Sequence, residues 1–175
     1  MQLIETKTLG TAAASIEFTS IPQDGTDLYI LASCRATSSG TSYLITNPNS
    51  ANASFRMLRG TGSGVFSQTD AISPYAEIPN ADFTSNTFAN ISIYFPNYAS
   101  TTTNKSFSID SVTENNATSS QQLIGAALYA SNTAITSVLL SAGDANLNKN
   151  RNFEVGTTIS LYKITKGTDG IVVVS

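Results

Sequence analysis

The amino-acid sequence predicts an all-β protein, folded as one jelly-roll-like β-sandwich domain of about 8–10 antiparallel strands that spans residues 1–175. Apolar and polar residues alternate with a period of two along the chain, which is typical of strands with one buried face. Clusters of Gly, Pro, Asn, Asp and Ser separate these runs. The chain has 175 residues, 41% of them apolar, which is enough for one hydrophobic core.

Each expected strand has its own alternating set of side chains. In chain order the strands lie at 3–6, 14–21, 26–36, 42–46, 53–58, 88–95, 105–112, 133–141 and 157–164. One face of the clearest strands carries Ile4 and Thr6, Ile16 and Phe18, Leu28, Ile30, Ala32 and Cys34, Ile91, Ile93 and Phe95, Phe107 and Ile109, and Ile159 and Leu161. Turn residues are expected at 22–25, 38–40, 47–49, 60–64, 143–144 and 167–170.

Segment 119–131 fits two kinds of element. Its apolar residues Leu123, Ile124, Ala127 and Leu128 have the spacing of the buried stripe of a short helix. Gly125 and the β-branched run that follows favour a strand instead. Of the two, we favour the strand.

The last residues also allow two interpretations. After a Gly-rich turn, the chain carries an uncharged apolar run, Ile171, Val172, Val173 and Val174. This run is either the last strand of the sandwich or part of a docking tail, 167–175, that contacts a neighbouring subunit, because exposed apolar strands tend to find a partner.

Composition argues against several kinds of partner. Charged residues make up 12% of the chain and its net charge is −3, so no basic stripe is available for nucleic acid. No run is long and apolar enough to span a membrane, and the opening MQLIETKTLG lacks an apolar signal core. The single cysteine, Cys34, fits folding in a reducing cytoplasm. Ser, Thr and Asn, roughly a third of the chain, are expected to cover the surface.

We predict no enzymatic activity. The chain contains no histidine, which removes the commonest general base and the Ser–His and Cys–His nucleophile pairs. Cys34 shares a strand face with Leu28 and Ile30, so it is expected in the core. Asp110 and Glu114 are close in sequence but are expected at the solvated end of one strand rather than as a catalytic pair.

Two loops resemble ligand-binding motifs only superficially. Residues 60–64, GTGSG, lack the Lys-Ser/Thr ending of a phosphate-binding loop and are expected to form a hairpin turn. Asp144, Asn146 and Asn148 have the spacing of a calcium loop, but Lys149 stands where that loop needs glycine. We therefore predict no metal site and no cofactor, and interpret the second loop as a polar turn.

Two stretches carry a resemblance to a known group of proteins. IETKTLGTAAASIEFTSIPQDGTDLYILASCRAT near the start and NFEVGTTISLYKIT near the end resemble small virion structural proteins of tailed bacteriophages, of the marine and cyanobacterial phage type. The matching stretches cover roughly the first 35 and the last 25 residues. They supply framework positions rather than functional ones, namely Ile16, Phe18, Leu28, Ile30, Phe153, Ile159 and Leu161.

The resemblance implies a jelly-roll virion protein, often a homotrimer, made in the host cytoplasm and placed on the particle surface. The first expectation is a capsid decoration, or cement, protein that binds the major capsid protein or other virion proteins, with the apolar tail as a contact. The alternative is a tail-fibre or receptor-binding domain that contacts host surface glycans. For that role Tyr75, Tyr94 and Tyr98 are the candidate contacts, because aromatic faces and neutral hydrogen-bonding groups suit sugars.

Overall fold

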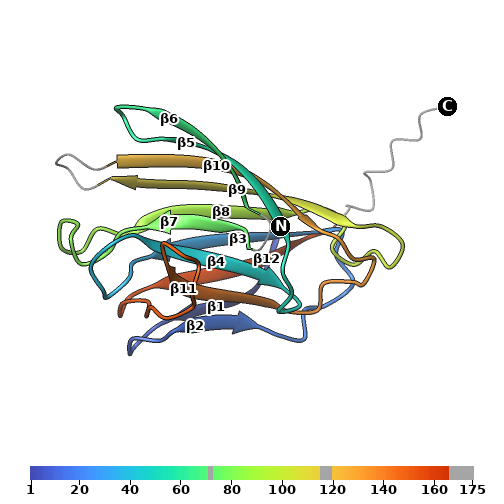
Figure 1. Cartoon of the computed structure of the whole chain (residues 1–175). Helices are drawn as coiled ribbons and strands as arrows, with labels where there is room; N and C mark the ends of the chain where they lie inside the picture. The colour runs from blue at the N-terminus through green and yellow to red at the C-terminus, as the bar shows by residue number, and fades with distance from the viewer. Residues whose placement is uncertain (71–72, 115–119, 166–175) are drawn as a thin grey trace.

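The computed structural model describes residues 1–70, 73–114 and 120–165, and this part of the chain is all β, as the sequence predicts (Figure 1). It contains twelve strands, more than the predicted number. They are β1 (Gln2–Thr8), β2 (Ser15–Phe18), β3 (Asp27–Cys34), β4 (Ser42–Pro48), β5 (Ser54–Gly60), β6 (Val65–Asp70), β7 (Tyr75–Ile78), β8 (Ala89–Phe95), β9 (Lys105–Glu114), β10 (Ser120–Tyr129), β11 (Val138–Asp144) and β12 (Thr158–Ile164).

The strands form two antiparallel sheets that pack as a sandwich. The larger sheet has the order β1-β12-β3-β8-β9-β10-β5-β6 and the smaller one β2-β11-β4-β7. If β1, β12 and the hairpin β9–β10 are set aside, the orders become β3-β8-β5-β6 and β2-β11-β4-β7. This is the strand order of an eight-stranded jelly roll. The hairpin β9–β10 widens one sheet by separating β8 from β5.

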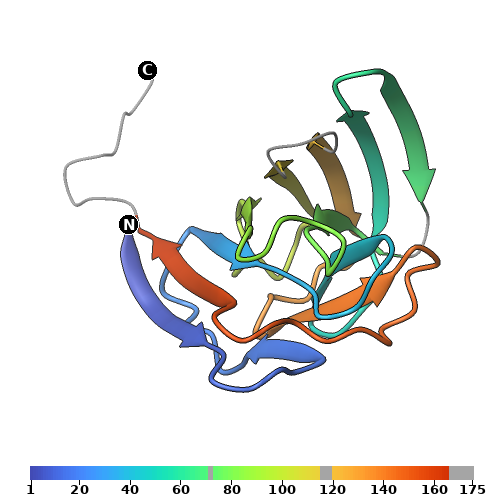
Figure 2. The same ribbon diagram turned by 90° about the vertical axis from the view of Figure 1, so that its left-hand side faces the viewer.

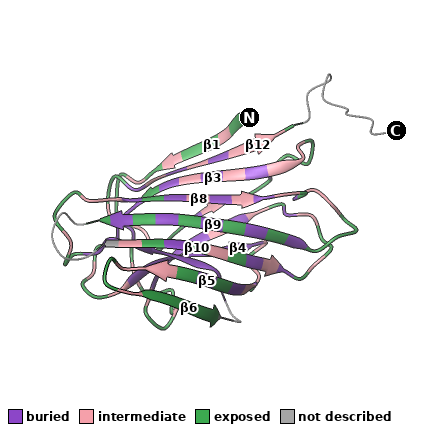
Figure 3. Ribbon diagram, turned by 90° about the horizontal axis from the view of Figure 1, so that it is seen from above, coloured by how far each residue is buried: buried purple, intermediate pink, exposed green. Residues whose placement is uncertain are grey.

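Alternation along the inner strands divides the larger sheet into a core face and an outer face (Figure 3). In β9, buried and exposed residues alternate from Lys105 to Glu114. The buried set includes Phe107, whose ring stacks on that of Phe95 at a centroid distance of 4.4 Å. Cys34 is fully buried in the same core, as predicted. The period-two pattern therefore locates the core correctly on these strands.

A second apolar cluster lies where β5 meets the smaller sheet. Every residue of β4 and of β7 is buried. The ring of Tyr75 lies 4.3 Å from that of Tyr43 and 5.2 Å from that of Phe55. Since Phe55 is on the larger sheet, this cluster joins the two layers at the β7 edge.

Segment 119–131 forms a strand over its described part, β10, which pairs with β9 and β5. Gly125 lies in the middle of β10, where the Phe55 ring covers it. A Cβ at this position would lie within 2.5 Å of the ring atom Cζ. The glycine thus marks a close approach of an aromatic side chain, which is one of the reasons for a glycine inside a strand.

The structure corrects details of the predicted boundaries. The expected turn at 47–49 begins later, because Asn47 and Pro48 are the end of β4 and pair with β11. The expected strand at 133–141 begins only at Val138, because the preceding residues are held by a side chain instead of a sheet: Asn49 Oδ1 accepts hydrogen bonds from the backbone N–H groups of Thr136 and Ser137. The predicted turn at 143–144 is the end of β11, and both residues pair with β4. The short strands β6 and β7 were not predicted.

Candidate functional site

The outer face of the eight-stranded sheet presents a broad surface with few charges. Directly opposed residues form lines across all eight strands. One line consists of Ser67, Leu58, Ile124, Asp110, Ser92, Leu31, Ser160 and Thr6, and a parallel one of Thr69, Arg56, Ala126, Ser108, Tyr94, Tyr29, Tyr162 and Leu3. Arg56 and Asp110 are the charged residues on these two lines. The others are hydroxyl-bearing, aliphatic or aromatic.

Three tyrosines lie side by side on the second line, one each on β8, β3 and β12. The rings of Tyr94 and Tyr29 meet edge to face at 6.4 Å. The Tyr94 hydroxyl donates a hydrogen bond to Asp27 Oδ2 at 2.9 Å, and this bond raises the pKa of Tyr94. Alternation along β3 predicts that Tyr29 lies on the other face of the strand from Leu28 and Ile30. The row of three tyrosines becomes visible only from the register across three strands.

One corner of the outer face is apolar and exposed. This apolar corner consists of Leu58, Val65, Val112 and Ile124, with exposed fractions of 50%, 79%, 42% and 50%. Leu58 and Ile124 are direct cross-strand partners. Large side chains that are half exposed next to one another mark a surface suited to contact with another molecule.

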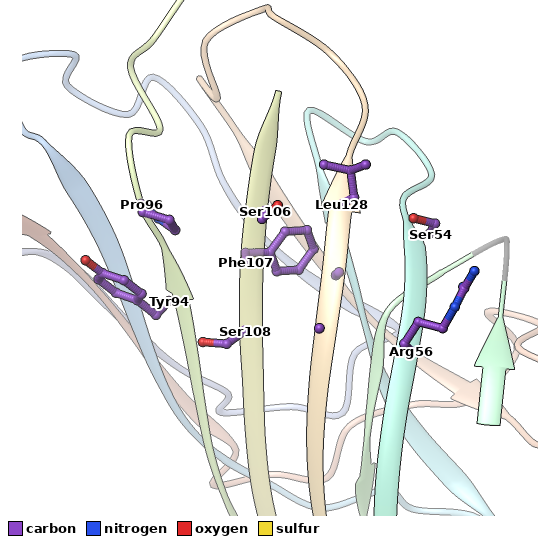
Figure 4. Close-up of a pocket in the computed structure, with 10 residues that line it drawn as sticks. Ser54, Arg56, Tyr94, Pro96, Ser106, Phe107, Ser108 and Leu128 are labelled. Atoms are coloured by element: carbon purple, nitrogen blue, oxygen red, sulfur yellow. The ribbon is translucent and has the colours of Figure 1, made fainter. Parts of the chain in front are cut away.

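Beside the apolar corner, the outer face forms a shallow trough of about 550 Å³ over β8, β9, β10 and β5 (Figure 4). Tyr94 and Pro96 stand on one side and Arg56 on the other. The serines Ser54, Ser106 and Ser108 line the space between them. Its small residues leave room for a ligand with several hydroxyl groups, and the trough is open to solvent along its length.

The structure places the three predicted tyrosines in different environments. Tyr75 lies in β7 and is 2% exposed, and Tyr98 is completely buried. The Tyr98 hydroxyl donates to the carbonyl oxygen of Pro22 and accepts from the N–H of Gly25, so its role is to fix the loop before β3. The expectation that these two present aromatic faces to a glycan is therefore wrong. Only Tyr94 lines the trough.

A partly buried polar network lies on the core side of β5, β7 and β10. Glu77 accepts hydrogen bonds from Arg59 at 3.3 Å and from the Gln121 side-chain amide at 2.5 Å. Burial raises the pKa of Glu77, and the Arg59 charge opposes this effect only in part. Thr113, the cross-strand partner of Gln121, has a buried hydroxyl that finds no hydrogen-bond partner among the described residues. This network ties the β5 side of the larger sheet to β7.

The loop after β11 is arranged around Asp144. Its carboxylate accepts hydrogen bonds from the backbone N–H groups of Asn146 and Asn148 and from the side-chain amides of Asn148 and Asn150. Hydrogen bonds, chiefly that from Asn150, lower the pKa of Asp144 to about 2. The loop therefore directs N–H donors at the carboxylate, whereas a calcium site needs oxygen ligands around the ion.

Other predicted features are found as follows. Burial raises the pKa of the Cys34 thiol, which disfavours the reactive thiolate. Residues 60–64 connect β5 to β6 as a hairpin. The predicted docking tail cannot be located, because its apolar run lies outside the described residues: Ile171, Val172, Val173 and Val174. Within the described ranges, no three Asp, Glu, Cys or His side chains come together in a way that could hold a metal ion, and no helix is long and apolar enough to cross a membrane.

Comparisons with protein-family models, with curated proteins and with solved structures find no match to this chain. The geometry of the outer face is then the direct guide to function. Few charges, a row of tyrosines and an apolar corner are typical of surfaces that contact another macromolecule. The trough beside them has the size of a small-ligand site.

Proposed function

We propose that this protein is a structural component of a bacteriophage particle, a capsid decoration protein that binds the assembled head without catalysing a reaction. The low-charge outer face of the eight-stranded sheet is the observation that carries the proposal. The resemblance of the first and last strands to small phage virion proteins supports the location. The jelly-roll strand order agrees with that resemblance.

The outer face suits protein contact because little has to be desolvated when it is covered. Burying a charge without a partner is costly, whereas hydroxyl groups and tyrosines form hydrogen bonds across an interface and contribute apolar area. The first of the two lines of opposed residues places Leu31 between Ser92 and Ser160. The core of a protein interface has this composition, since it is depleted of charged residues and enriched in tyrosine.

Binding of this kind stabilises a shell by mass action. A protein that binds the assembled shell and not its free subunits shifts the equilibrium toward the assembled state. At a free concentration about 100 times the dissociation constant, each occupied site contributes about 2.7 kcal/mol. Many copies per head would make this contribution large without any single strong contact.

The copy number per purified particle tests the proposal. Quantitative mass spectrometry should give hundreds of copies for a head decoration protein, while a dozen or so would place the protein in the tail and refute this function. The variant Leu31→Lys puts a charge in the centre of the outer face and should abolish binding to undecorated heads. Val155→Lys is the matched control, since Val155 is 53% exposed in a loop outside the sheet.

A second candidate function is contact with a host surface glycan through the trough. Tyr94 supplies an aromatic wall, Arg56 a donor, and three serines neutral hydrogen-bonding groups. A glycan-binding screen should then give hits that disappear with Tyr94→Ala and persist with Tyr162→Ala. No binding to any glycan would rule this candidate out and leave the decoration role as the proposal.

A further inference from the structure

The two edges of the eight-stranded sheet differ in how they are protected. Edge strand β1 carries charges: Lys7 lies 3.6 Å from Glu5, and its ammonium group donates a hydrogen bond to the backbone oxygen of Glu17 at 2.6 Å. Lysine on an edge strand discourages pairing with another chain. The opposite edge strand, β6 (Val65–Asp70), has the sequence VFSQTD, with neither lysine nor proline. Among the described strands only β5 pairs with β6, so its other edge is open to an added strand.

Apolar side chains flank this edge on both faces of the sheet. Val65 belongs to the apolar corner of the outer face and is 79% exposed. Phe66 points to the other face, opposite Arg59, and is 48% exposed although the Arg59 guanidinium lies over its ring at 5.2 Å. Figure 2 shows the β5–β6 hairpin at the far end of the sheet from β1 and β12. A strand added here would need apolar side chains on both of its faces.

The C-terminal run of the chain is an uncharged segment with this property. Ile171, Val172, Val173 and Val174 are all β-branched, and β-branched residues have the highest strand propensity. In a strand, Ile171 and Val173 would face one side and the other two valines the opposite side. The added strand would then cover Val65 on one face and Phe66 on the other.

The segment cannot reach β6 of its own molecule. Strand β12 ends at Ile164, and β12 and β6 are separated by six strand spacings in the sheet, about 29 Å. Seven Cα–Cα steps separate Ile164 from Ile171, and they extend over at most about 25 Å. Figure 3 shows β12 next to one edge of the sheet and β6 at the other edge. The occupant of the edge must therefore come from another copy.

We propose that residues 171–174 of a second copy add as a strand to the free edge of β6. Backbone hydrogen bonds to the edge supply affinity, and the four apolar side chains cover Val65 and Phe66. Because each copy has one edge and one tail, the contact is head-to-tail and closes into a ring or continues as a chain. The contact does not depend on what the outer face binds.

Light scattering on the 175-residue protein at about 100 μM tests the proposal. A contact with a dissociation constant above this concentration would contribute little to assembly. The expected mass exceeds that of the monomer and falls to it with Val65→Lys, which protects the edge, and with Val173→Pro, which breaks the added strand. Leu3→Lys is the matched control: Leu3 is 51% exposed on the other edge strand, and this variant should assemble normally. A monomeric wild-type protein, or assembly that survives either variant, overturns the proposal.

A mixing experiment separates a direct contact from an indirect effect on folding. The Val65→Lys protein keeps an intact tail, and the Val173→Pro protein keeps an intact edge. Each should be monomeric alone, while an equal mixture should form a heterodimer and nothing larger, because one working edge and one working tail remain. Two variants that stay monomeric when mixed refute the edge-to-tail contact.

Discussion

Gly125→Ala is expected to destabilise the protein strongly although it adds a single methyl group. The new Cβ would lie within 2.5 Å of Phe55 Cζ and closer still to Cε2, whereas real Cβ atoms essentially never approach another heavy atom within 3.0 Å. The ring cannot move aside freely, because Phe55 is 1% exposed and packs against Tyr75 at 5.2 Å. The added methyl must therefore displace the ring, the strand or both.

The size of the effect follows from two opposing contributions. Overpacking a core by a methyl group costs about 1–3 kcal/mol, and the short distance here places Gly125→Ala at the upper end. Replacing glycine restricts the unfolded chain and returns about 0.4–1 kcal/mol. The expected net loss is about 2–2.6 kcal/mol, which lowers the melting temperature by about 4–10 °C in a protein of this size.

Thermal and urea unfolding of the variant measure this loss. Gly60→Ala is the control, since nothing lies within 4 Å of a Cβ at Gly60, and it should lose no stability and gain about 0.4–1 kcal/mol from the restricted unfolded chain. Combining Gly125→Ala with Phe55→Leu should cost less than the sum of the two single changes, because the smaller side chain makes room. A Gly125→Ala protein as stable as the wild type would show that the ring does not lie over this position.

Two further predictions concern charged groups. Because burial raises the pKa of Glu77, its ionisation opposes folding as the pH rises from 4.5 through the folded-state pKa, and Glu77→Gln should therefore gain stability relative to the wild type across that range. Glu77→Ala should lose about 3 kcal/mol at neutral pH, because it leaves Arg59 and Gln121 without their acceptor. Urea unfolding at a series of pH values measures both effects. A Gln variant with an unchanged pH profile would contradict this. Asp144 has a lowered pKa, so the ionised side chain stabilises the fold at pH values above 3.8, its ordinary pKa, and this contribution disappears as the pH falls to about 2. Asp144→Asn should therefore lower the melting temperature near pH 7 and leave it unchanged near pH 2. An equal loss at both pH values would refute the assignment.

The framework strands could be predicted because their side chains alternate over one buried face. Leu28 and Ile30 in β3 and Phe107 and Ile109 in β9 are examples, and the same rule placed Cys34 in the core. Strand β7 could not be found this way, since all its residues are buried and the alternation disappears. β6 could not be found either, because an edge strand exposes both faces.

The candidate site was harder to predict than the fold. Tyr75 and Tyr98 are aromatic residues with a polar hydroxyl, and sequence alone does not distinguish a tyrosine at the surface from one whose hydroxyl is hydrogen-bonded inside. Tyr98 finds its partners at Pro22 and Gly25, more than 70 residues away in the chain. The row of Tyr94, Tyr29 and Tyr162 depends in the same way on the pairing of distant strands.

The pairing of β1 with β12 has a consequence for synthesis on the ribosome. Glu5 lies opposite Leu161 and Lys7 opposite Ile159, so the first strand must wait for almost the whole chain to be translated before it gains its partner. The pairing of β3 is delayed as well, because both of its neighbours, β8 and β12, are translated after it. Sheets built from such distant contacts fold slowly, and their unpaired strands are prone to aggregate meanwhile. The nascent protein is thus expected to depend on chaperones until its last strand leaves the ribosome.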